Sequence, residues 1–393
     1  MRLLHTADWH LGRTLHGASL LDAQAAVIEQ IVELVRSERP DALILAGDVF
    51  DRAYPPLAAV ELFDEAVTQL AETRVPVVIT SGNHDSAIRL GMNARVAEAA
   101  GIHIRTRLDR IAAAIEITSG AGDERAALYG VPYLDPPSAA PALGALQPSH
   151  AGVLGAALSQ IAVDRDQRAA DFAVVAAHGV VAGGQQVGET GGGVERSIDV
   201  GGVAAVPREL FAGVDYVAMG HLHRPQGLGD RVRYSGAPLA FSFDEAADKK
   251  SVAMVTLAAG AAPEVELIPT PQPRAMARLR GTLDELLTGD EHASAESAWV
   301  EATLTDRLRP KLAMEQLRRR YPHILKLAHE PVRDGAEELD ATLSYGERVR
   351  GRSELEVAER FLAEVRGGTA ADAEEHALLQ EAFEAFGREE ALR

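Results

Sequence analysis

Residues 4–12 read Leu-His-Thr-Ala-Asp-Trp-His-Leu-Gly, an apolar start that passes into an acid, an aromatic ring and an imidazole. The same change follows residues 42–45, which lead into Gly-Asp-Val-Phe-Asp, and residues 75–79, which lead toward Gly-Asn-His-Asp. Short apolar runs bounded by turn residues indicate buried strands. The sequence therefore predicts three strands that each end in side chains of catalytic type.

Amphipathic stretches at residues 21–35 and 57–70 lie between these strands, with apolar positions at helical spacing. Strands that alternate with helices predict an α/β layered fold. From residue 172 onward, strands follow one another with little helix between them, so we expect the second half of the sheet to be mixed or antiparallel. These later strands are expected at residues 172–176, 214–219, 232–234 and 252–257.

The composition limits the classes of function. The 393 residues are enough for two or three domains, and 39 basic against 58 acidic side chains give a net charge of −19. That charge is opposite to what a general DNA-coating protein carries, so any nucleic acid must be met locally. Cysteine is absent, which excludes thiolate ligands and fits a reducing compartment. Because no apolar run reaches about 18 residues, we expect a cytoplasmic protein without a membrane segment.

A second domain is expected after the Pro-Gln-Pro sequence at 271–273, which resembles a linker. Beyond it the pattern restarts, with strands at 274–280 and 298–304 and helices at 282–287 and 310–320. Two further amphipathic helices follow residue 353, separated by a Gly-Gly pair. The predicted organisation is a catalytic domain at 1–270, a small α/β domain at 274–330, a linker at 331–352 and a helical segment at 353–393.

Five clusters contain nearly all the residues that could bind a metal: 8–10, 47–51, 82–85, 178–179 and 220–223. Asp8 and His10 are two positions apart, as are His221 and His223, so each pair points to one side of an extended chain. Carboxylate, amide and imidazole ligands suit Mn²⁺, Fe²⁺ or Zn²⁺, and they are too many here for one tetrahedral ion. We therefore expect two ions roughly 3.5 to 4 Å apart, with Asp48 as the candidate bridge.

In this order the clusters resemble those of the calcineurin-like metallophosphoesterases, over residues 1–270. The resemblance implies a double-layered β-sandwich flanked by helices, with a dinuclear site at its strand ends. Within that superfamily, residues 4–12 and 47–54, together with Ser-Gly-Ala-Pro at 235–238 and Phe-Ser-Phe-Asp-Glu at 241–245, look like the SbcD family of bacterial nuclease subunits. The resemblance extends through the small domain to the C-terminal helix pair, and we expect the small domain to cap the metal site and to contact DNA.

The resemblance also implies a ligand set and a preference for Mn²⁺. The first ion would be held by Asp8, His10, Asp48 and His223, and the second by Asp48, Asn83, His178 and His221. His84 would protonate the departing sugar oxygen or stabilise the pentacovalent state. Asp51 stands where some relatives carry a histidine, and its carboxylate could orient His84 and raise its pKa. Asp85 competes for that role.

Other residues are candidates for substrate contact. Arg52 completes a Gly-Asp-x-x-Asp-Arg motif that also resembles the phosphoprotein phosphatases, in which the arginine grips phosphate. Trp9 could stack on a nucleobase, although an aromatic ring between two ligands more often packs beneath the site. The stretch at 307–320 contains six basic residues, and Glu315 is its acidic residue. This positive charge is typical of either a surface that contacts a polyanion or a solvated helix face. The six basic residues are Arg307, Arg309, Lys311, Arg318, Arg319 and Arg320.

The resemblance implies a Mn²⁺-dependent DNA exonuclease, 3′-to-5′ on duplex ends, that is also an endonuclease on single strands and hairpins. It would act in DNA repair and recombination, associated with the nucleoid, as a homodimer. The sequence has no Gly-x-x-x-x-Gly-Lys-Ser/Thr motif, so ATP dependence must come from a partner. By resemblance that partner is an SbcC-type coiled-coil ATPase, docked on the helices after residue 353, which could instead fold back on the catalytic domain.

Two other functions compete with this one. A phosphatase or small-molecule phosphodiesterase is the alternative enzyme, because the metal site alone does not distinguish DNA from small esters. A nonenzymatic scaffold for the ATPase would require a broken ligand set, and every expected ligand is present in the sequence.

Overall fold

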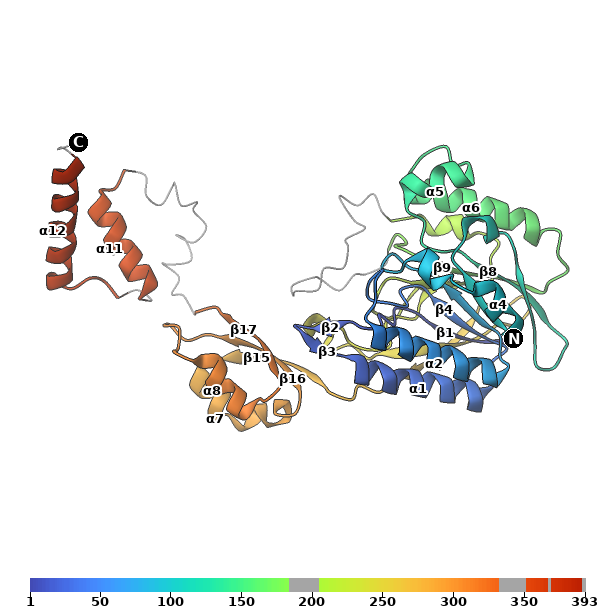
Figure 1. Ribbon diagram of the computed structural model, residues 1–393, viewed down its shortest axis with the longest axis horizontal. Coiled ribbons are helices and arrows are strands. Elements are labelled where there is room, and N and C mark those ends of the chain that lie inside the picture. Colours follow the sequence, from blue (N-terminus) through green and yellow to red (C-terminus); the bar gives the residue numbers. More distant parts are fainter. Residues whose placement is uncertain (184–204, 332–350, 367–368, 391–393) are drawn as a thin grey trace. The chain divides into compact units, whose positions relative to one another are not determined.

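The structure is a computed structural model, and it describes residues 1–183, 205–331, 351–366 and 369–390. The chain divides into two units, Met1–Arg274 and Ala275–Arg393 (Figure 1). Almost all of the predicted linker at 331–352 lies outside the described residues. No helix within the described ranges is both long and apolar enough to cross a membrane.

The first sheet of the larger unit has six strands, in the spatial order β14, β13, β1, β4, β5, β6. Strands β1, β4, β5 and β6 run parallel, whereas β13 and β14 are antiparallel additions at one side. The parallel core contains the three strands predicted from the opening motifs. The bounds are β1 Arg2–Thr6, β4 Ala42–Ala46, β5 Val77–Thr80, β6 Ile102–Arg105, β13 Ser251–Thr256 and β14 Glu264–Pro269.

The second sheet also has six strands, in the order β11, β12, β10, β9, β8, β7. Its four central strands run parallel, and the edge strands β7 and β11 are antiparallel. The later strands are mixed, as expected, but most of them form this second sheet instead of extending the first. The bounds are β7 Ile115–Thr118, β8 Arg125–Gly130, β9 Phe172–His178, β10 Tyr216–Gly220, β11 Gln226–Leu228 and β12 Val232–Tyr234.

The two sheets pack face to face around one apolar core. Leu3 and Ile44 of the first sheet and Leu128 and Val174 of the second are each fully buried in it. Neighbouring residues such as Val175 point to the opposite face, against the helices. Because both faces of the central strands are buried, strands such as β4 and β9 appear in the sequence as continuous apolar runs, whereas the edge strand β7 alternates between buried and exposed residues.

Helices cover the outer faces of the sandwich, as the resemblance implied. Helices α1 and α2 lie side by side along the first sheet (Figure 1), and α5 and α6 pack on the second, where Leu143 and Leu154 share a core with Tyr129. The bounds are α1 Leu21–Glu38, α2 Leu57–Thr73, α3 Ala87–Leu90, α4 Ala94–Ala97, α5 Pro136–Leu143 and α6 His150–Arg165, with a small hairpin of β2 Thr14–Leu15 and β3 Ala18–Ser19.

The smaller unit contains a parallel three-stranded sheet, β15 Met276–Gly281, β16 Trp299–Leu304 and β17 Ile324–His329. Helices α7 Leu283–Thr288 and α8 Ala313–Arg320 pack on it around Leu286 and Leu317. Helix α8 begins three residues later than predicted, because Leu312 has a left-handed conformation with φ of 53°. Residues 307–311 therefore precede the helix.

Helices α11 Glu354–Val365 and α12 Ala373–Glu390 form a pair. Arg366 binds Glu375 through two hydrogen bonds of 2.7 Å each, and His376 pairs with Glu359. Large apolar side chains on both helices remain about 60% exposed, among them Phe361 at 63% and Phe386 at 58%. The pair thus presents apolar surface that the described part of the chain leaves uncovered.

Candidate metal centre

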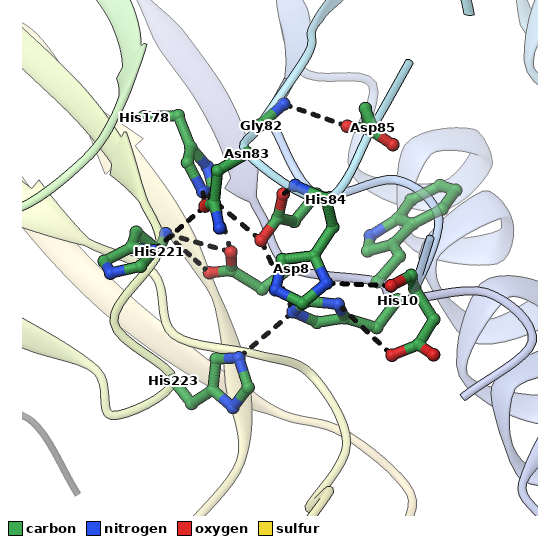
Figure 2. Close-up of polar contacts among 12 residues, drawn as sticks. Asp8, His10, Gly82, Asn83, His84, Asp85, His178, His221 and His223 are labelled. Carbon is green, nitrogen blue, oxygen red and sulfur yellow. Dashed lines mark hydrogen bonds and ion pairs between the residues drawn. The ribbon is translucent and has the colours of Figure 1, made fainter. Parts of the chain in front are cut away.

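Loops from both sheets meet at one end of the sandwich, at the carboxyl ends of the parallel strands (Figure 2). The loops after β1, β4 and β5 deliver residues 8–10, 48–51 and 82–85. His178 ends β9, and His221 begins the loop after β10. The structure thereby brings together all the side chains that the sequence predicted as ligands: Asp8, His10, Asp48, Asn83, His178, His221 and His223.

Four of these residues have backbone conformations that residues with side chains rarely adopt. The φ angle is 55° at Asp8, 43° at His10, 49° at Asp48 and 107° at His221. A left-handed conformation costs a non-glycine residue on the order of 1 kcal/mol or more. Such conformations persist only where the surrounding structure enforces them, and they cluster at functional sites.

Two glycines of the predicted clusters allow close approach between loops. A Cβ atom on Gly82 would lie 2.1 Å from Oδ1 of Asp48, and one on Gly220 would lie 1.9 Å from the carbonyl oxygen of Ala46. Real Cβ atoms do not approach other atoms so closely, so any side chain at either position would displace a loop that carries a ligand.

Asp8, His10 and His223 form a first ligand group, in which all three side chains are buried and their donor atoms lie within 4.8 Å of one another. The Nε2 atoms of His10 and His223 are 3.1 Å apart. Asp8 accepts hydrogen bonds from the backbone amide of His221 at 2.9 and 3.1 Å, which fixes its carboxylate.

Asp48, Asn83, His178 and His221 form a second ligand group. Oδ1 of Asn83 lies 3.0 Å from Nε2 of His178 and 3.2 Å from Nδ1 of His221. Nδ1 of His178 donates to the carbonyl oxygen of Ala46 at 2.9 Å, and this bond leaves Nε2 to face the group. A neutral imidazole held in this way offers its free nitrogen as a metal ligand.

One oxygen of Asp48 faces both groups. Its Oδ2 lies 3.3 Å from Nε2 of His178 and 3.6 Å from Nε2 of His10. Its Oδ1 is occupied by the backbone amide of His84, at 2.9 Å. Burial acts to raise the pKa of Asp48, but His178 and other nearby histidines hold that pKa well below its usual value. The arrangement is the one expected of a carboxylate shared by two cations.

The donor set fits divalent cations. The atoms that face one another at 3.0 to 3.6 Å are carboxylate or amide oxygens and imidazole nitrogens, which repel unless a proton or metal lies between them. Against the effect of burial, the charges of Asp48 and Asp8 raise the pKa of His178 to about 9. Positive charge is therefore favoured at the position where a metal ion can bind. A further sign of an incomplete site is the amide Nδ2 of Asn83, which is buried without a hydrogen-bond partner among the described residues.

His84 borders both ligand groups and is half-buried. Its ring packs edge-on against that of His10, with centroids 4.8 Å apart. Nδ1 of His84 lies 2.8 Å from the main-chain carbonyl oxygen of Asp51. The Asp51 carboxylate instead faces Arg13 at 3.4 Å and Arg52 at 3.5 Å. The prediction that a carboxylate orients His84 is therefore wrong, because a backbone carbonyl does so.

Asp85 was considered as a residue that orients His84, but in the structure it joins two loops. Its carboxylate accepts hydrogen bonds from the backbone amides of Val49, Phe50 and Gly82, at 2.9 to 3.1 Å. These bonds join the loop of Asp48 to the loop of Asn83. Burial, and after it the charge of Asp48, raises the pKa of Asp85 to about 7, while the three amides act in the opposite direction.

Comparison with protein families adds to this geometry. A model of the calcineurin-like phosphoesterases matches residues 1–225, which include every predicted ligand. The chain belongs to the calcineurin-like phosphoesterase family. This membership confirms the predicted fold and implies divalent metal ions. A second family model, the Type 5 capsule protein repressor C-terminal domain (SbcD_C), matches residues 272–366.

Individual proteins are similar to this phosphoesterase over much of its length. The SbcD subunit of the nuclease SbcCD from Rhodobacter capsulatus is 39% identical over 298 residues, which cover 71% of each chain. The chain is therefore a homologue of that nuclease subunit. A solved structure, TT1561 of Thermus thermophilus, is 13% identical with a TM-score of 0.39, and the match covers 68% of this chain and 98% of that one.

Trp9 and Arg52 were both candidate substrate contacts in the phosphoesterase domain. Trp9 is only 3% exposed and donates a hydrogen bond from Nε1 to Oγ1 of Thr6 at 3.0 Å, so it packs beneath the site as the favoured interpretation stated. The side chain of Arg52 is 57% exposed beside Asp51. Its contact with phosphate stays a prediction.

Two positioning contacts in the phosphoesterase domain escaped sequence analysis. Gln24 of α1 donates from Nε2 to the carbonyl oxygens of His10 and Trp9, at 2.6 and 3.1 Å, and its Oε1 accepts from the amide of Gly12 at 3.1 Å. It is 2% exposed on an otherwise apolar helix face. In the sequence, the sign of this role was a single polar residue on a helix face that is otherwise apolar.

Glu245 is the second missed residue, within the run at 241–245 that was noted only as a resemblance. Its Oε1 lies 3.2 Å from Nδ1 of His223, and Lys250 donates to its Oε2. Burial acts to raise the pKa of Glu245, but His223 and Lys250 hold that pKa far below its usual value. The signal in the sequence was an acidic residue that follows Phe241 and Phe243, but the sequence did not indicate that His223 would be its partner.

The other basic residues predicted to contact substrate lie in the smaller unit. Arg307, Arg309 and Lys311 are exposed before α8, and Arg318 and Arg319 are exposed in its last turn. Arg320 differs, because its side chain is 14% exposed and donates to Glu296 at 3.0 Å and to the carbonyl oxygen of Leu286 at 3.2 Å. Its assignment to substrate contact is wrong, since these bonds hold it within the unit.

Proposed function

We propose that this chain is the nuclease subunit of an ATP-dependent SbcCD-type complex, a phosphodiesterase that cuts DNA. The observation that carries the proposal is the position of Asp48 Oδ2, between His178 at 3.3 Å and His10 at 3.6 Å. This shared oxygen suits two-metal hydrolysis of a phosphodiester. The homology to the SbcD subunit of an SbcCD nuclease supports DNA as the substrate.

For metal binding, we assign the first ion to Asp8, His10, Asp48 and His223, and the second to Asp48, Asn83, His178 and His221. The mixture of carboxylate, amide and imidazole donors is compatible with Mn²⁺. The chemistry that such ions supply when bound is polarisation of the phosphoryl oxygens and activation of water. The roles of Gln24, Asp85 and the two glycines are to hold the loops so that these donors converge.

His84 is the proposed proton donor to the departing sugar oxygen. Since its Nδ1 faces the Asp51 carbonyl at 2.8 Å, the ring is fixed and Nε2 is the atom left to meet substrate. In the protonated ring, Nε2–H can donate to the leaving oxygen or to the pentacovalent state. The Asp51 carboxylate faces Arg13 at 3.4 Å, and we assign it no proton transfer.

DNA would be met by local positive charge, since the chain as a whole carries −19. We assign phosphate contacts to Arg52 and to five residues of the smaller unit: Arg307, Arg309, Lys311, Arg318 and Arg319. The proposed activities are 3′-to-5′ exonuclease on duplex ends and endonuclease on single strands and hairpins, in repair and recombination. Such a substrate would place the protein at the nucleoid.

The exposed apolar faces of α11 and α12 are proposed as the docking site of an SbcC-type coiled-coil ATPase. Phe361, Val365, Leu378 and Phe386 are each between 58% and 64% exposed. Amphipathic helices with such faces bind apolar grooves on partners. The SbcD_C model matches residues 272–366, which include α11 but not α12.

A second apolar surface supports homodimer formation. It lies around α2, α3 and α4, and in it Ile88 is 89% exposed, Val96 74%, Leu57 73% and Met92 71%. Arg89 stacks on Tyr54 with 4.1 Å between its Cζ atom and the ring centroid, so the loop of Tyr54 and α3 are adjacent. Exposed apolar clusters on soluble domains mark interaction sites. We propose a second copy of the chain as the occupant.

The test is a cleavage assay with full-length protein and Mn²⁺, with and without the ATPase. The substrates are a hairpin duplex and bis(p-nitrophenyl) phosphate. We expect hairpin cleavage that EDTA abolishes and Mn²⁺ restores. Cleavage of the small ester alone would favour the small-molecule phosphodiesterase, and cleavage of neither by metal-loaded protein would favour the scaffold.

A further inference from the structure

A buried carboxylate lies behind one ligand of the first group. Glu245 is 3% exposed at the end of a short helical turn, Phe243–Glu245. Its Oε1 lies 3.2 Å from Nδ1 of His223 and accepts a hydrogen bond from Oγ of Ser242 at 3.1 Å. Since an ionised carboxylate only accepts, Nδ1 of His223 carries the hydrogen. The free lone pair is then on Nε2, which faces Nε2 of His10 at 3.1 Å.

Lys250 holds this carboxylate in place from the other side. Its ammonium group donates to Oε2 of Glu245 and, at 3.0 Å, to the carbonyl oxygen of His223. Lys250 is 3% exposed, so neither charge is screened by solvent. The backbone and the ring of His223 are therefore both tied to one buried ion pair.

The second ligand group lacks this device at His178. There Nδ1 donates to a neutral backbone carbonyl, that of Ala46, at 2.9 Å. The carboxylate oxygen of Asp8 lies 3.9 Å from the same nitrogen, beyond hydrogen-bond distance. A carboxylate partner makes an imidazole a stronger electron donor than a carbonyl partner does, because it stabilises positive charge on the ring.

We propose that Glu245 is a positioning residue that strengthens the binding of a metal ion by the first ligand group. It does so by fixing the Nδ1–H tautomer of His223 and increasing the basicity of Nε2, while Lys250 keeps the carboxylate oriented. This inference rests on the proposed assignment of two ions to the two groups. It concerns a residue behind one of the ligands, to which that assignment gives no role.

The test is calorimetric titration of Mn²⁺ into metal-free, full-length protein. We expect wild type to bind two ions in two steps. The Glu245→Gln variant should bind one ion about 10- to 100-fold more weakly, the usual effect of losing such a partner, with the other ion unchanged. Unchanged binding of both ions, or equal weakening of both, would overturn the proposal.

Two further variants separate positioning from folding. Glu245→Gln leaves Lys250 buried without its anion, so Glu245→Gln/Lys250→Met, which removes both charges, provides a folded comparison if the single variant unfolds. We expect the same selective weakening from it. Asp166→Asn is the matched control, because it removes one carboxylate charge from a residue that binds Arg165, at 2.8 Å, just after α6 and outside both ligand groups. Its Mn²⁺ affinities should equal those of wild type, and selective weakening by this variant would contradict the assignment to Glu245.

A second readout does not depend on metal or activity. In metal-free wild type, nitrogen NMR of the His223 ring should show hydrogen on Nδ1 only. In a Glu245→Leu/Lys250→Met variant, which removes the acceptor beside Nδ1, the ring should populate both tautomers, whereas an unchanged Nδ1–H tautomer would overturn the proposal. If wild-type protein bound one ion or none, the two-ion assignment itself would fail, an outcome distinct from failure of the Glu245 variants alone.

Discussion

The main-chain carbonyl of Asp51 lies 2.8 Å from Nδ1 of His84, so the orientation of His84 depends on the course of the backbone and not on a neighbouring carboxylate. The Asp51 carboxylate is engaged with Arg13 and Arg52. This division of roles within one residue leads to opposite expectations for substitutions at positions 84 and 51.

Replacement of His84 by alanine should lower kcat for hairpin cleavage by roughly 10²- to 10⁴-fold, the usual contribution of a general acid. Mn²⁺ binding should be retained, since His84 is outside the proposed ligand set. Asp51→Asn keeps the carbonyl and should retain most of the activity. A His84→Ala variant that cut DNA at the wild-type rate would remove the proposed role.

Asp48→Asn should weaken both bound ions, because one oxygen faces both ligand groups. A neutral amide oxygen loses the charge that both cations share, and we expect affinity to fall by about 10²-fold or more for each ion. Metal analysis after dialysis measures this directly. Asn83→Ala is the comparison, and it should weaken one ion only. Retention of both ions by Asp48→Asn would exclude a bridging role.

His5 makes stability depend on pH. It is fully buried in β1, with Nδ1 2.8 Å from the hydroxyl of Tyr216, and burial lowers its pKa to about 3. Below about pH 6.5 the unfolded chain binds a proton at this residue and the folded protein does not. The free energy of unfolding therefore falls with decreasing pH, by up to about 1.4 kcal/mol per unit from this residue.

Urea unfolding of metal-free wild type and His5→Gln between pH 7 and 5 isolates that contribution. The variant loses the hydrogen bond and is less stable at pH 7, but wild type should lose more stability on acidification. The difference between the two proteins should therefore shrink as the pH decreases. A difference that stayed constant across this range would show that His5 is protonated equally in both states.

The surface around α3 should control oligomeric state. Ile88→Glu combined with Met92→Glu places two charges where the side chains are 89% and 71% exposed, and it should convert a dimer to a monomer. Light scattering after gel filtration measures the mass. Leu146→Glu, at a fully exposed position in the loop between α5 and α6, is the control and should leave the dimer intact. A dimer that survives the double substitution rules out this surface.

Binding of the ATPase should depend on the helix pair. Phe361→Ser with Phe386→Ser removes two exposed aromatic rings and should weaken the complex at least about tenfold, the effect of losing anchors worth more than 1.4 kcal/mol. Sedimentation of purified subunits measures the complex. Leu308→Ser, which removes an apolar side chain 57% exposed in the same unit, is the control. Hydrolysis of the small ester should be unchanged in all variants.

Much of the fold could be predicted because buried strands leave apolar runs that end at polar residues. The runs at 42–45 and 75–79 became β4 and β5, and their following residues lie at one end of the sandwich. The division into two sheets followed from the resemblance to the metallophosphoesterases and not from the strand pattern, since a run such as that of β9 is equally apolar whichever sheet it joins. Pairing depends on contacts between distant segments.

The donors of the site could also be predicted, but not the groups that hold them. Asp85 and Gln24 bind main-chain atoms of loops whose course is unknown before folding. Arg320 appeared equivalent to Arg319 in the sequence, and only the packing of α8 against Leu286 separates them. The sequence gives the chemical type of each side chain, whereas the main-chain atoms that a side chain contacts depend on how the loops fold.

The left-handed backbone at His10 has a consequence for how this site can change over evolution. His10 must supply an imidazole while it occupies a conformation suited to glycine, whereas His223 has no such positive φ. No single replacement meets both demands at position 10: glycine relaxes the chain and loses the donor, and other donors keep the strain. Tolerance to mutation should therefore be narrower at the amino-terminal motif than at the distal histidine, even though both residues belong to the same ligand group.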